Sequence, residues 1–172
     1  MIRYVNNAST NISRQPGQSK PMPSILVVED HPFMAQMMRR LLRKKGQLEI
    51  WDIVETAEAA LAALVAASTL KSGEPPFQND GASPLPDLAL VDISLPGMSG
   101  VDLLTELGRL YPDLPCLIVS AHSHPSYAQQ VLERGARGYV AKEEAMTIIE
   151  AIKQVLKGEV YLSDNMRQAL EK

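Results

Sequence analysis

The chain has 172 residues, of which 45% are hydrophobic and 22% are charged, with a net charge of −3. This length supports one well-buried domain with extensions, and the composition excludes a wholly disordered chain. Residues 1–24 carry three basic residues (Arg3, Arg14 and Lys20) and no acid, so a net charge of −6 is left for the rest. Such a mildly acidic body excludes a general attraction for nucleic acid or for a membrane surface.

The cysteine and hydropathy patterns exclude further classes. Cys116 is the only cysteine, which excludes an internal disulfide and a cysteine-cluster metal site. It lies in the apolar run 116–119, which indicates a small buried core residue. No stretch approaches the roughly 18 apolar residues that a membrane-spanning helix needs, and the polar N-terminus lacks the apolar segment of a secretory signal. We therefore expect a cytoplasmic protein without membrane contact.

The first elements follow a polar leader. Residues 1–23 contain few apolar residues and several prolines, which predicts a disordered leader. The continuous apolar run 25–28 is typical of a strand that is buried on both faces. Apolar residues then recur at helical spacing over residues 33–45, and Gly46 ends that helix.

A strand, a helix and an insertion come next. Residues 48–54 alternate between apolar and polar like a strand, and the alanine- and leucine-rich segment 58–70 predicts a helix. Residues 71–86 hold four prolines and two glycines, which predicts a loop insertion before the next strand.

The remaining elements complete an alternating pattern. Three strands are expected over residues 88–91, 116–119 and 138–141, and three helices over 101–111, 127–134 and 144–157. Five strands that alternate with five helices predict an α/β fold with a doubly wound parallel sheet and helices on both faces. The domain is expected to span residues 24–158, and residues 159–172 to form a linker or a short helix.

Polar side chains follow four of the strands, namely Glu29 and Asp30, Asp92, Ser120, and Lys142. In a doubly wound sheet the carboxyl ends of the strands form the ligand-binding edge, so these residues should converge there. Clustered carboxylates suit Mg²⁺, an aspartate can act as a nucleophile toward phosphate, and a lysine and a hydroxyl can bind the phosphoryl oxygens. Taken singly, Asp30 is as typical of a helix cap as of a metal ligand, Ser120 is more typical of a turn or cap, and Lys142 is more typical of a solvated surface.

Four motifs resemble the response-regulator receiver domain over about residues 24–158. They are residues 25–31 (ILVVEDH), 90–100 (LVDISLPGMSG), 118–121 (IVSA) and 135–142 (GARGYVAK). The resemblance implies a flavodoxin-like strand order of 2-1-3-4-5.

The resemblance also implies residue roles. It makes Asp92 the phosphorylated residue of a metal site for Mg²⁺ or Mn²⁺. Asp30 would bind the ion directly and Glu29 through water, and the backbone carbonyl of Ser94 would complete the site.

Three further side chains are implied to act once Asp92 is phosphorylated. Ser120 would bind the phosphoryl group and Lys142 would pair with it. Tyr139 matches an aromatic residue that swings inward as Ser120 moves, which turns a local charge into a surface change. Alternatively, Tyr139 is an ordinary aromatic residue of a strand, with its side chain half exposed.

Two segments are similar to NarL/FixJ-type regulators: residues 29–32 (EDHP) and residues 158–163 (GEVYLS). In those regulators the second segment leads into a LuxR-type helix-turn-helix domain. Here the chain ends at Lys172, so we expect either a stand-alone receiver or a receiver excised from a longer regulator. DNA binding would need such an additional domain.

One position departs from the usual receiver pattern, and one further residue lies close to the expected phosphorylation site. Many receivers have a cis proline after the lysine, whereas Glu143 follows Lys142 here. A cis bond before a residue other than proline costs about 3 kcal/mol, so we expect a trans bond. His122 lies two residues after Ser120, where it could tune phosphate lifetime or be an ordinary exposed loop histidine.

The sequence thus predicts a signalling switch that takes phosphate from a sensor histidine kinase or a phosphotransfer protein. It would phosphorylate itself from phosphodonors, lose the phosphate slowly, and remodel a homodimer or partner surface on its last two helices, in the control of transcription. A pseudo-receiver that binds partners without phosphorylation is the alternative. A haloacid-dehalogenase-type phosphohydrolase would need an aspartate where Ser94 stands, and a flavin or dinucleotide binder would need a different loop from that at residues 29–31.

Overall fold

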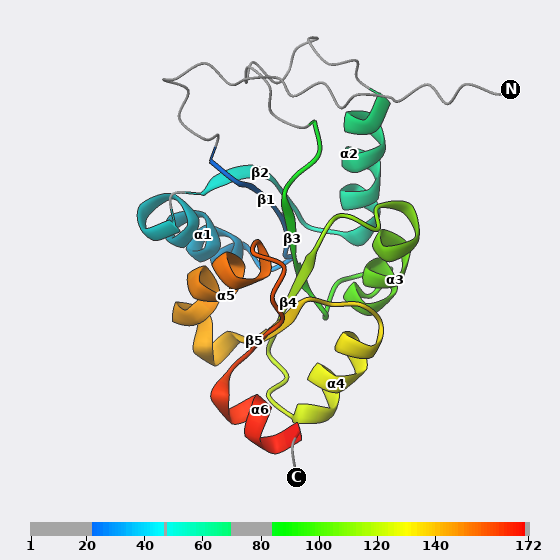
Figure 1. Ribbon diagram of the computed structural model, residues 1–172. Coiled ribbons are helices and arrows are strands. Elements are labelled where there is room, and N and C mark those ends of the chain that lie inside the picture. The colour runs from blue at the N-terminus through cyan, green and yellow to red at the C-terminus, as the bar shows by residue number, and fades with distance from the viewer. Residues whose placement is uncertain (1–21, 47, 70–83, 171–172) are drawn as a thin grey trace, which may run out of the picture.

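The computed structural model describes residues 22–46, 48–69 and 84–170. In these residues a parallel sheet lies between two layers of helices (Figure 1). The strands are β1 (Ser24–Val28), β2 (Glu49–Val54), β3 (Leu88–Asp92), β4 (Cys116–Ser120), β5 (Gly138–Ala141) and β6 (Tyr161–Leu162). Their order is β2-β1-β3-β4-β5-β6. The predicted α/β fold and the order 2-1-3-4-5 are confirmed, and β6 extends the sheet beyond β5.

The helices divide between the two faces of the sheet. They are α1 (Pro32–Leu41), α2 (Ala57–Thr69), α3 (Gly100–Leu110), α4 (Pro125–Glu133), α5 (Ile148–Val155) and α6 (Asp164–Leu170). Helices α1 and α5 pack over one apolar cluster, and α2, α3 and α4 pack over the other (Figure 1). Strands β3 and β4 are buried along their whole length, as their continuous apolar runs predict. None of the helices in this described part of the chain is long and apolar enough to cross a membrane.

Two of the predicted helices are not continuous α-helices. After α1 the chain forms one π-helical segment, η1 (Leu42–Gly46). The expected helix over residues 144–157 begins as a 3₁₀ segment, η2 (Lys142–Thr147), in which Glu144 departs from helical geometry at φ −100° and ψ 24°. The apolar spacing of α5 extends past this kink, so periodicity alone could not reveal it. The bond between Lys142 and Glu143 is trans, as predicted.

The ends of the domain carry the remaining differences. In the segment expected to be a linker or short helix, the chain adds the short strand β6 and then α6. The predicted leader over residues 1–23 and the predicted insertion over residues 71–86 lie almost wholly outside the described residues. Both therefore remain predictions.

Candidate functional site

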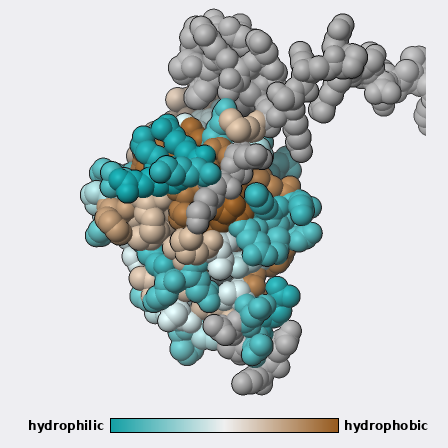
Figure 2. All heavy atoms as spheres, turned by 90° about the vertical axis from the view of Figure 1, so that its left-hand side faces the viewer, coloured by the Kyte–Doolittle hydropathy of each residue, from teal (hydrophilic) through white to brown (hydrophobic). Residues whose placement is uncertain are grey.

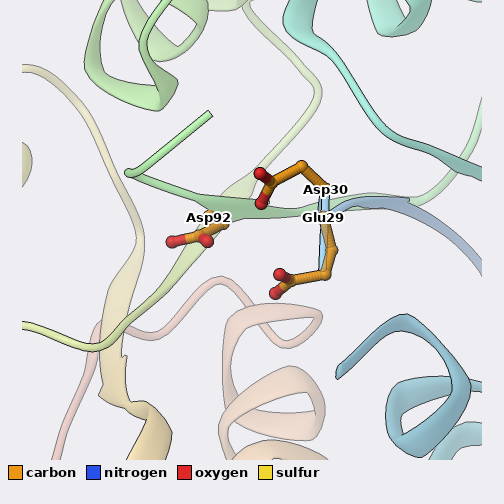
Figure 3. A group of neighbouring side chains, drawn as sticks. All are labelled: Glu29, Asp30 and Asp92. Atoms are coloured by element: carbon orange, nitrogen blue, oxygen red, sulfur yellow. The ribbon is translucent and has the colours of Figure 1, made fainter. Parts of the chain in front are cut away.

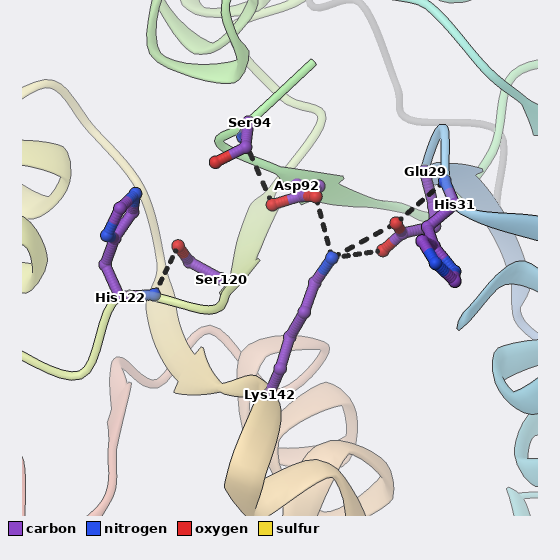
Figure 4. A network of polar contacts seen from close by, with 7 residues as sticks. All are labelled: Glu29, His31, Asp92, Ser94, Ser120, His122 and Lys142. Atoms are coloured by element: carbon purple, nitrogen blue, oxygen red, sulfur yellow. Dashed lines mark hydrogen bonds and ion pairs between the residues drawn. The ribbon is translucent and has the colours of Figure 1, made fainter. Parts of the chain in front are cut away.

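The ends of four neighbouring strands bring the predicted site residues to one edge of the sheet. Glu29 and Asp30 follow β1, Asp92 ends β3, Ser120 ends β4, and Lys142 follows β5. These strands lie side by side in the sheet, so their carboxyl ends open onto the same edge (Figure 4).

Three carboxylates converge at this edge. Oxygens of Glu29, Asp30 and Asp92 lie within 4.8 Å of one another, and Figure 3 shows the three groups facing a shared space. Glu29 and Asp92 are buried, with 3% and 4% of their surfaces exposed, whereas Asp30 is exposed. Mg²⁺ is usually bound through one or two carboxylates, with its remaining positions taken by water and phosphate oxygens, and this cluster can supply those carboxylates.

Lys142 supplies the positive charge within this cluster. Its Nζ lies 2.7 Å from Asp92 Oδ2, and 2.9 Å and 3.1 Å from the two carboxylate oxygens of Glu29 (Figure 4). Burial alone would lower the pKa of Lys142, but the hydrogen bonds to Asp92 and Glu29 raise it overall. The amine therefore stays protonated.

The charges at the site do not balance. Burial raises the pKa of Glu29, and the contact with Lys142 only partly opposes this effect, while Asp92 adds to it. The site also holds three carboxylates and a single ammonium, that of Lys142. A divalent cation beside them would offset the remaining negative charge, so the donor set and its electrostatics both fit a metal site.

The loop between β3 and α3 sets the position of Asp92. The backbone N–H of Ser94 donates to Asp92 Oδ1 at 3.2 Å. A Cβ atom on Gly100 would lie 1.9 Å from the backbone oxygen of Asp92, so only glycine allows α3 to begin this close to the strand end. The motif over residues 90–100 contains this glycine, but its packing reason appears only in three dimensions.

Glu58 is a site-supporting residue that the sequence analysis missed. Its side chain reaches from α2 and accepts a hydrogen bond from the backbone N–H of Met98 at 3.0 Å, which ties α2 to the loop after β3. The two residues are 40 positions apart. No local pattern marks a helix acid that binds so distant a loop.

Ser120 and Tyr139 are joined through His122. The Oγ of Ser120 accepts a hydrogen bond from the N–H of His122 at 3.1 Å, and the hydroxyl of Tyr139 donates to the carbonyl of His122. Ser120 and Tyr139 are both fully buried, so the half-exposed interpretation of Tyr139 does not hold in this structure. Burial also raises the pKa of Tyr139.

His122 has more contacts than an ordinary loop histidine. Its ring stacks on the ring of Tyr127 in α4, with the centroids 4.4 Å apart. The backbone of His122 binds Ser120 and Tyr139 while its side chain touches α4, so it links the end of β4 to that helix.

The structure therefore brings some of the predicted site residues into contact and leaves others apart. Glu29, Asp92 and Lys142 are in direct contact, and Asp30 borders them. The hydrogen bond of Ser120 runs to His122 rather than to Asp92 (Figure 4). The predicted roles of Ser120 and of the Ser94 carbonyl stay predictions.

Comparisons with known proteins agree with this geometry. The family model described as the response regulator receiver domain matches residues 25–154. The transcriptional regulatory protein DegU of Brevibacillus brevis is 30% identical over 149 residues, which cover 86% of this chain and 56% of that protein. The response regulator GacA of Pseudomonas aeruginosa is 27% identical over 150 residues, which cover 87% of this chain and 62% of GacA. This chain thus spans less than two thirds of the length of these relatives.

Solved structures show the same fold. The signal receiver domain of the regulator NarL from Mycobacterium tuberculosis is 27% identical and has a TM-score of 0.66, over 81% of this chain and all of that one. A LuxR-family two-component response regulator from Aurantimonas is 22% identical with a TM-score of 0.73, over 87% of this chain and 96% of that one. The matched family model covers most of the chain and includes every strand end of the site. The chain belongs to the response regulator receiver domain family and is a signalling switch of the two-component type rather than a conventional enzyme.

Proposed function

We propose that Asp92 accepts a phosphoryl group from a sensor histidine kinase or a phosphotransfer protein, with Mg²⁺ or Mn²⁺ beside it. The observation that carries this proposal is the contact of Lys142 with both Asp92 and Glu29 at an edge where three carboxylates meet. A nucleophilic carboxylate, a fixed cation and a site that fits a metal are the parts that phosphoryl transfer to an aspartate requires.

Different residues have different roles in the proposed phosphoryl transfer. A carboxylate oxygen of Asp92 forms the new P–O bond while the P–N bond of the donor phosphohistidine breaks, and the electron pair of that bond stays on the imidazole nitrogen. Glu29, Asp30, Asp92 and the backbone carbonyl of Ser94 would hold the metal ion, which supplies charge neutralisation for the phosphoryl oxygens. Lys142 already lies 2.7 Å from Asp92, so it can bind a phosphoryl oxygen with a small movement.

The switch itself is assigned to Ser120 and Tyr139. The Oγ of Ser120 can leave the N–H of His122 and bind a phosphoryl oxygen on Asp92. Tyr139 is fully buried with its hydroxyl on the carbonyl of His122, which is the inward position that the switch needs. Phosphorylation then shifts a pre-existing equilibrium of the loop after β4 and of α4.

The output surface that we propose differs from the one that the sequence suggests. Strand β6 pairs with β5, and α6 lies against α4, so the surface between the last two main helices is partly covered. Figure 2 shows the other face of the sheet from α4, where α1 and α5 form the helical layer, with apolar surface bordered by hydrophilic side chains. Met34, Met37 and Ile149 are partly buried there, and Phe33 and Met146 are largely exposed. We propose this α1–α5 surface for the kinase or for a homodimer formed on phosphorylation, in the control of transcription.

Mass spectrometry after incubation with Mg²⁺ and acetyl phosphate tests the proposal. The wild-type chain should gain the mass of one phosphoryl group, and Asp92→Asn should gain none. Asp113→Asn, an exposed aspartate outside the site, should be labelled like the wild type. Labelling that persists in Asp92→Asn, or no labelling of the wild type, would show instead that this chain is not a phosphoacceptor at Asp92.

A further inference from the structure

The C-terminal segment, residues 159–170, folds back onto the receiver domain instead of leaving it. Strand β6 pairs with β5 in parallel, with Gly138 opposite Tyr161 and Tyr139 opposite Leu162. Helix α6 then packs against α4. Figure 1 shows this segment running beside β5 and ending below α4.

The domain has a site shaped for this segment. A Cβ atom on Gly138 would lie 2.9 Å from the backbone oxygen of Tyr161 and 3.1 Å from its Cβ, so glycine permits the close approach of the two strands. The side chains that the segment contributes are buried, with Tyr161 7% and Met166 4% exposed. Removing these apolar groups from water stabilises the docked arrangement.

The docked segment encloses Tyr139. Paired residues of adjacent strands point to the same face of a sheet, so the side chain of Leu162 lies beside that of Tyr139. Met166 belongs to the same apolar cluster as Tyr139, together with Ala128 and Val131 of α4. Without β6, β5 would be an edge strand, and the ring of Tyr139 could turn past that edge into solvent. With β6 and α6 in place, Leu162 and Met166 pack in the apolar cluster that contains Tyr139.

We infer that the C-terminal segment is an intramolecular brace that holds Tyr139 in its buried position and so favours phosphorylation of Asp92. This inference rests on the proposed function, because it requires that phosphorylation favours the buried tyrosine. Coupling between two such events is reciprocal. The docked segment therefore increases the affinity of the site for a phosphoryl group, and phosphorylation tightens the docking of the segment by the same factor.

The first test measures docking in the full wild-type chain. Beryllium fluoride with Mg²⁺ serves as the phosphoryl mimic at Asp92, and hydrogen exchange is followed in peptides that cover α6. Exchange should slow by at least about fivefold when the mimic binds, which is the lower range of typical coupling between sites. Exchange that is unchanged or faster in the presence of the bound mimic would overturn the brace.

The second test measures the reciprocal effect. Met166→Asp places a charge in the buried face of α6, and Gln168→Asp places the same charge on its exposed face. The beryllium fluoride concentration for half-saturation, measured by calorimetry, should rise at least about fivefold in Met166→Asp and stay unchanged in Gln168→Asp. Equal affinities in the two variants would contradict the inference.

Two further variants separate the possible failures. Met166→Ala is a milder form of the test if Met166→Asp does not fold, and circular dichroism checks this. In a Tyr139→Ala background, Met166→Asp should have no additional effect, because the residue that the segment braces is gone. A wild-type chain that does not bind the mimic refutes the proposed function and the brace together. A wild-type chain that binds it, with no difference between Met166→Asp and Gln168→Asp, refutes the brace alone.

Discussion

At the scale of single residues, the site combines two buried carboxylates with one ammonium. Breaking such a contact by removing one partner leaves an uncompensated buried charge, which is costly. Lys142 therefore matters to the unphosphorylated domain as well as to the proposed phosphorylated form, because its ammonium offsets part of the negative charge of Glu29 and Asp92 when no phosphoryl group is bound. Asp30 is exposed, so its charge is solvated and does not depend on Lys142 in this way.

Mg²⁺ should stabilise the folded chain through Asp30. At a concentration one hundred times its dissociation constant, a ligand that binds only the folded state adds about 2.7 kcal/mol to the free energy of unfolding. Asp30→Asn should lose most of this gain, and Asp113→Asn should keep it, as measured by urea unfolding with and without Mg²⁺. A full Mg²⁺ effect in Asp30→Asn would exclude Asp30 as a ligand.

Cys116 should be chemically inert in the folded protein. Its side chain is buried, and burial raises the pKa of the thiol to about 12, so the reactive thiolate is nearly absent at neutral pH. A thiol-reactive reagent should modify the chain only as fast as the domain opens, and at once in denaturant. Fast modification under native conditions would show that β4 is not packed as described.

At the scale of elements, the start of α3 fixes the position of Asp92. Gly100 lies so close to the end of β3 that any side chain would displace the backbone at Asp92. Glu58 holds the intervening loop from α2 through the N–H of Met98. The position of Asp92 thus depends on two neighbouring helices as well as on its own strand.

Two glycines of α3 should respond oppositely to alanine. Gly100→Ala should lower the free energy of unfolding by about 1–3 kcal/mol because of overpacking, and it should also slow phosphorylation. A Cβ atom on Gly108 would meet no atom within 4 Å apart from the backbone of its own helix and its chain neighbours, so Gly108→Ala should raise the free energy of unfolding by up to about 1 kcal/mol, because alanine favours the helix. Urea unfolding of both variants measures this. Equal effects of the two changes would contradict the close approach at Gly100.

Some of these elements were predictable from the sequence and others were not. Strands β3 and β4 are continuous apolar runs, and Gly135 adopts a positive φ of 96° just after α4, so local patterns were sufficient there. Strand β6 has two residues and exists only through its pairing with β5, so it has no periodicity of its own. The link from Ser120 through His122 to Tyr139 uses backbone groups, which side-chain patterns do not report.

At the scale of the whole molecule, the site affects how the stability of the folded chain changes at alkaline pH. The pKa of Lys142 lies above its ordinary value of 10.5, and that of Tyr139 above 10.0, so the folded state holds both protons more tightly than the unfolded state. Their contribution to stability is fully present below those ordinary values. It is lost as the pH rises through the higher pKa values of the folded state.

Asp92→Asn should change this alkaline profile. The substitution removes one of the two carboxylates that raise the pKa of Lys142, so the loss of stability should still begin near pH 10.5 but should be smaller and end at a lower pH than in the wild type. Lys153→Gln, which changes an exposed lysine of α5, should keep the wild-type profile. Unfolding followed by circular dichroism between neutral and alkaline pH measures the difference. An identical profile for Asp92→Asn would contradict the coupling of these two residues.

The whole molecule also separates its input from its output. The proposed phosphorylation site lies at the carboxyl edge of the sheet, the C-terminal segment covers β5 and part of α4, and the apolar α1–α5 surface is the one proposed for a partner. These three regions meet at β5, which carries Tyr139 and leads into Lys142. A change at Asp92 can therefore reach either helical layer through one strand.

Chemical localisation of the phosphoryl group tests the central claim most directly. The chain is treated with acetyl phosphate and Mg²⁺, then reduced with borohydride, which converts an aspartyl phosphate to homoserine, and its peptides are sequenced by mass spectrometry. The predicted result is homoserine at position 92 alone, and only when Mg²⁺ is present. Homoserine at Asp30 or at another aspartate, or none at position 92, would contradict the assignment of Asp92 as the phosphoacceptor.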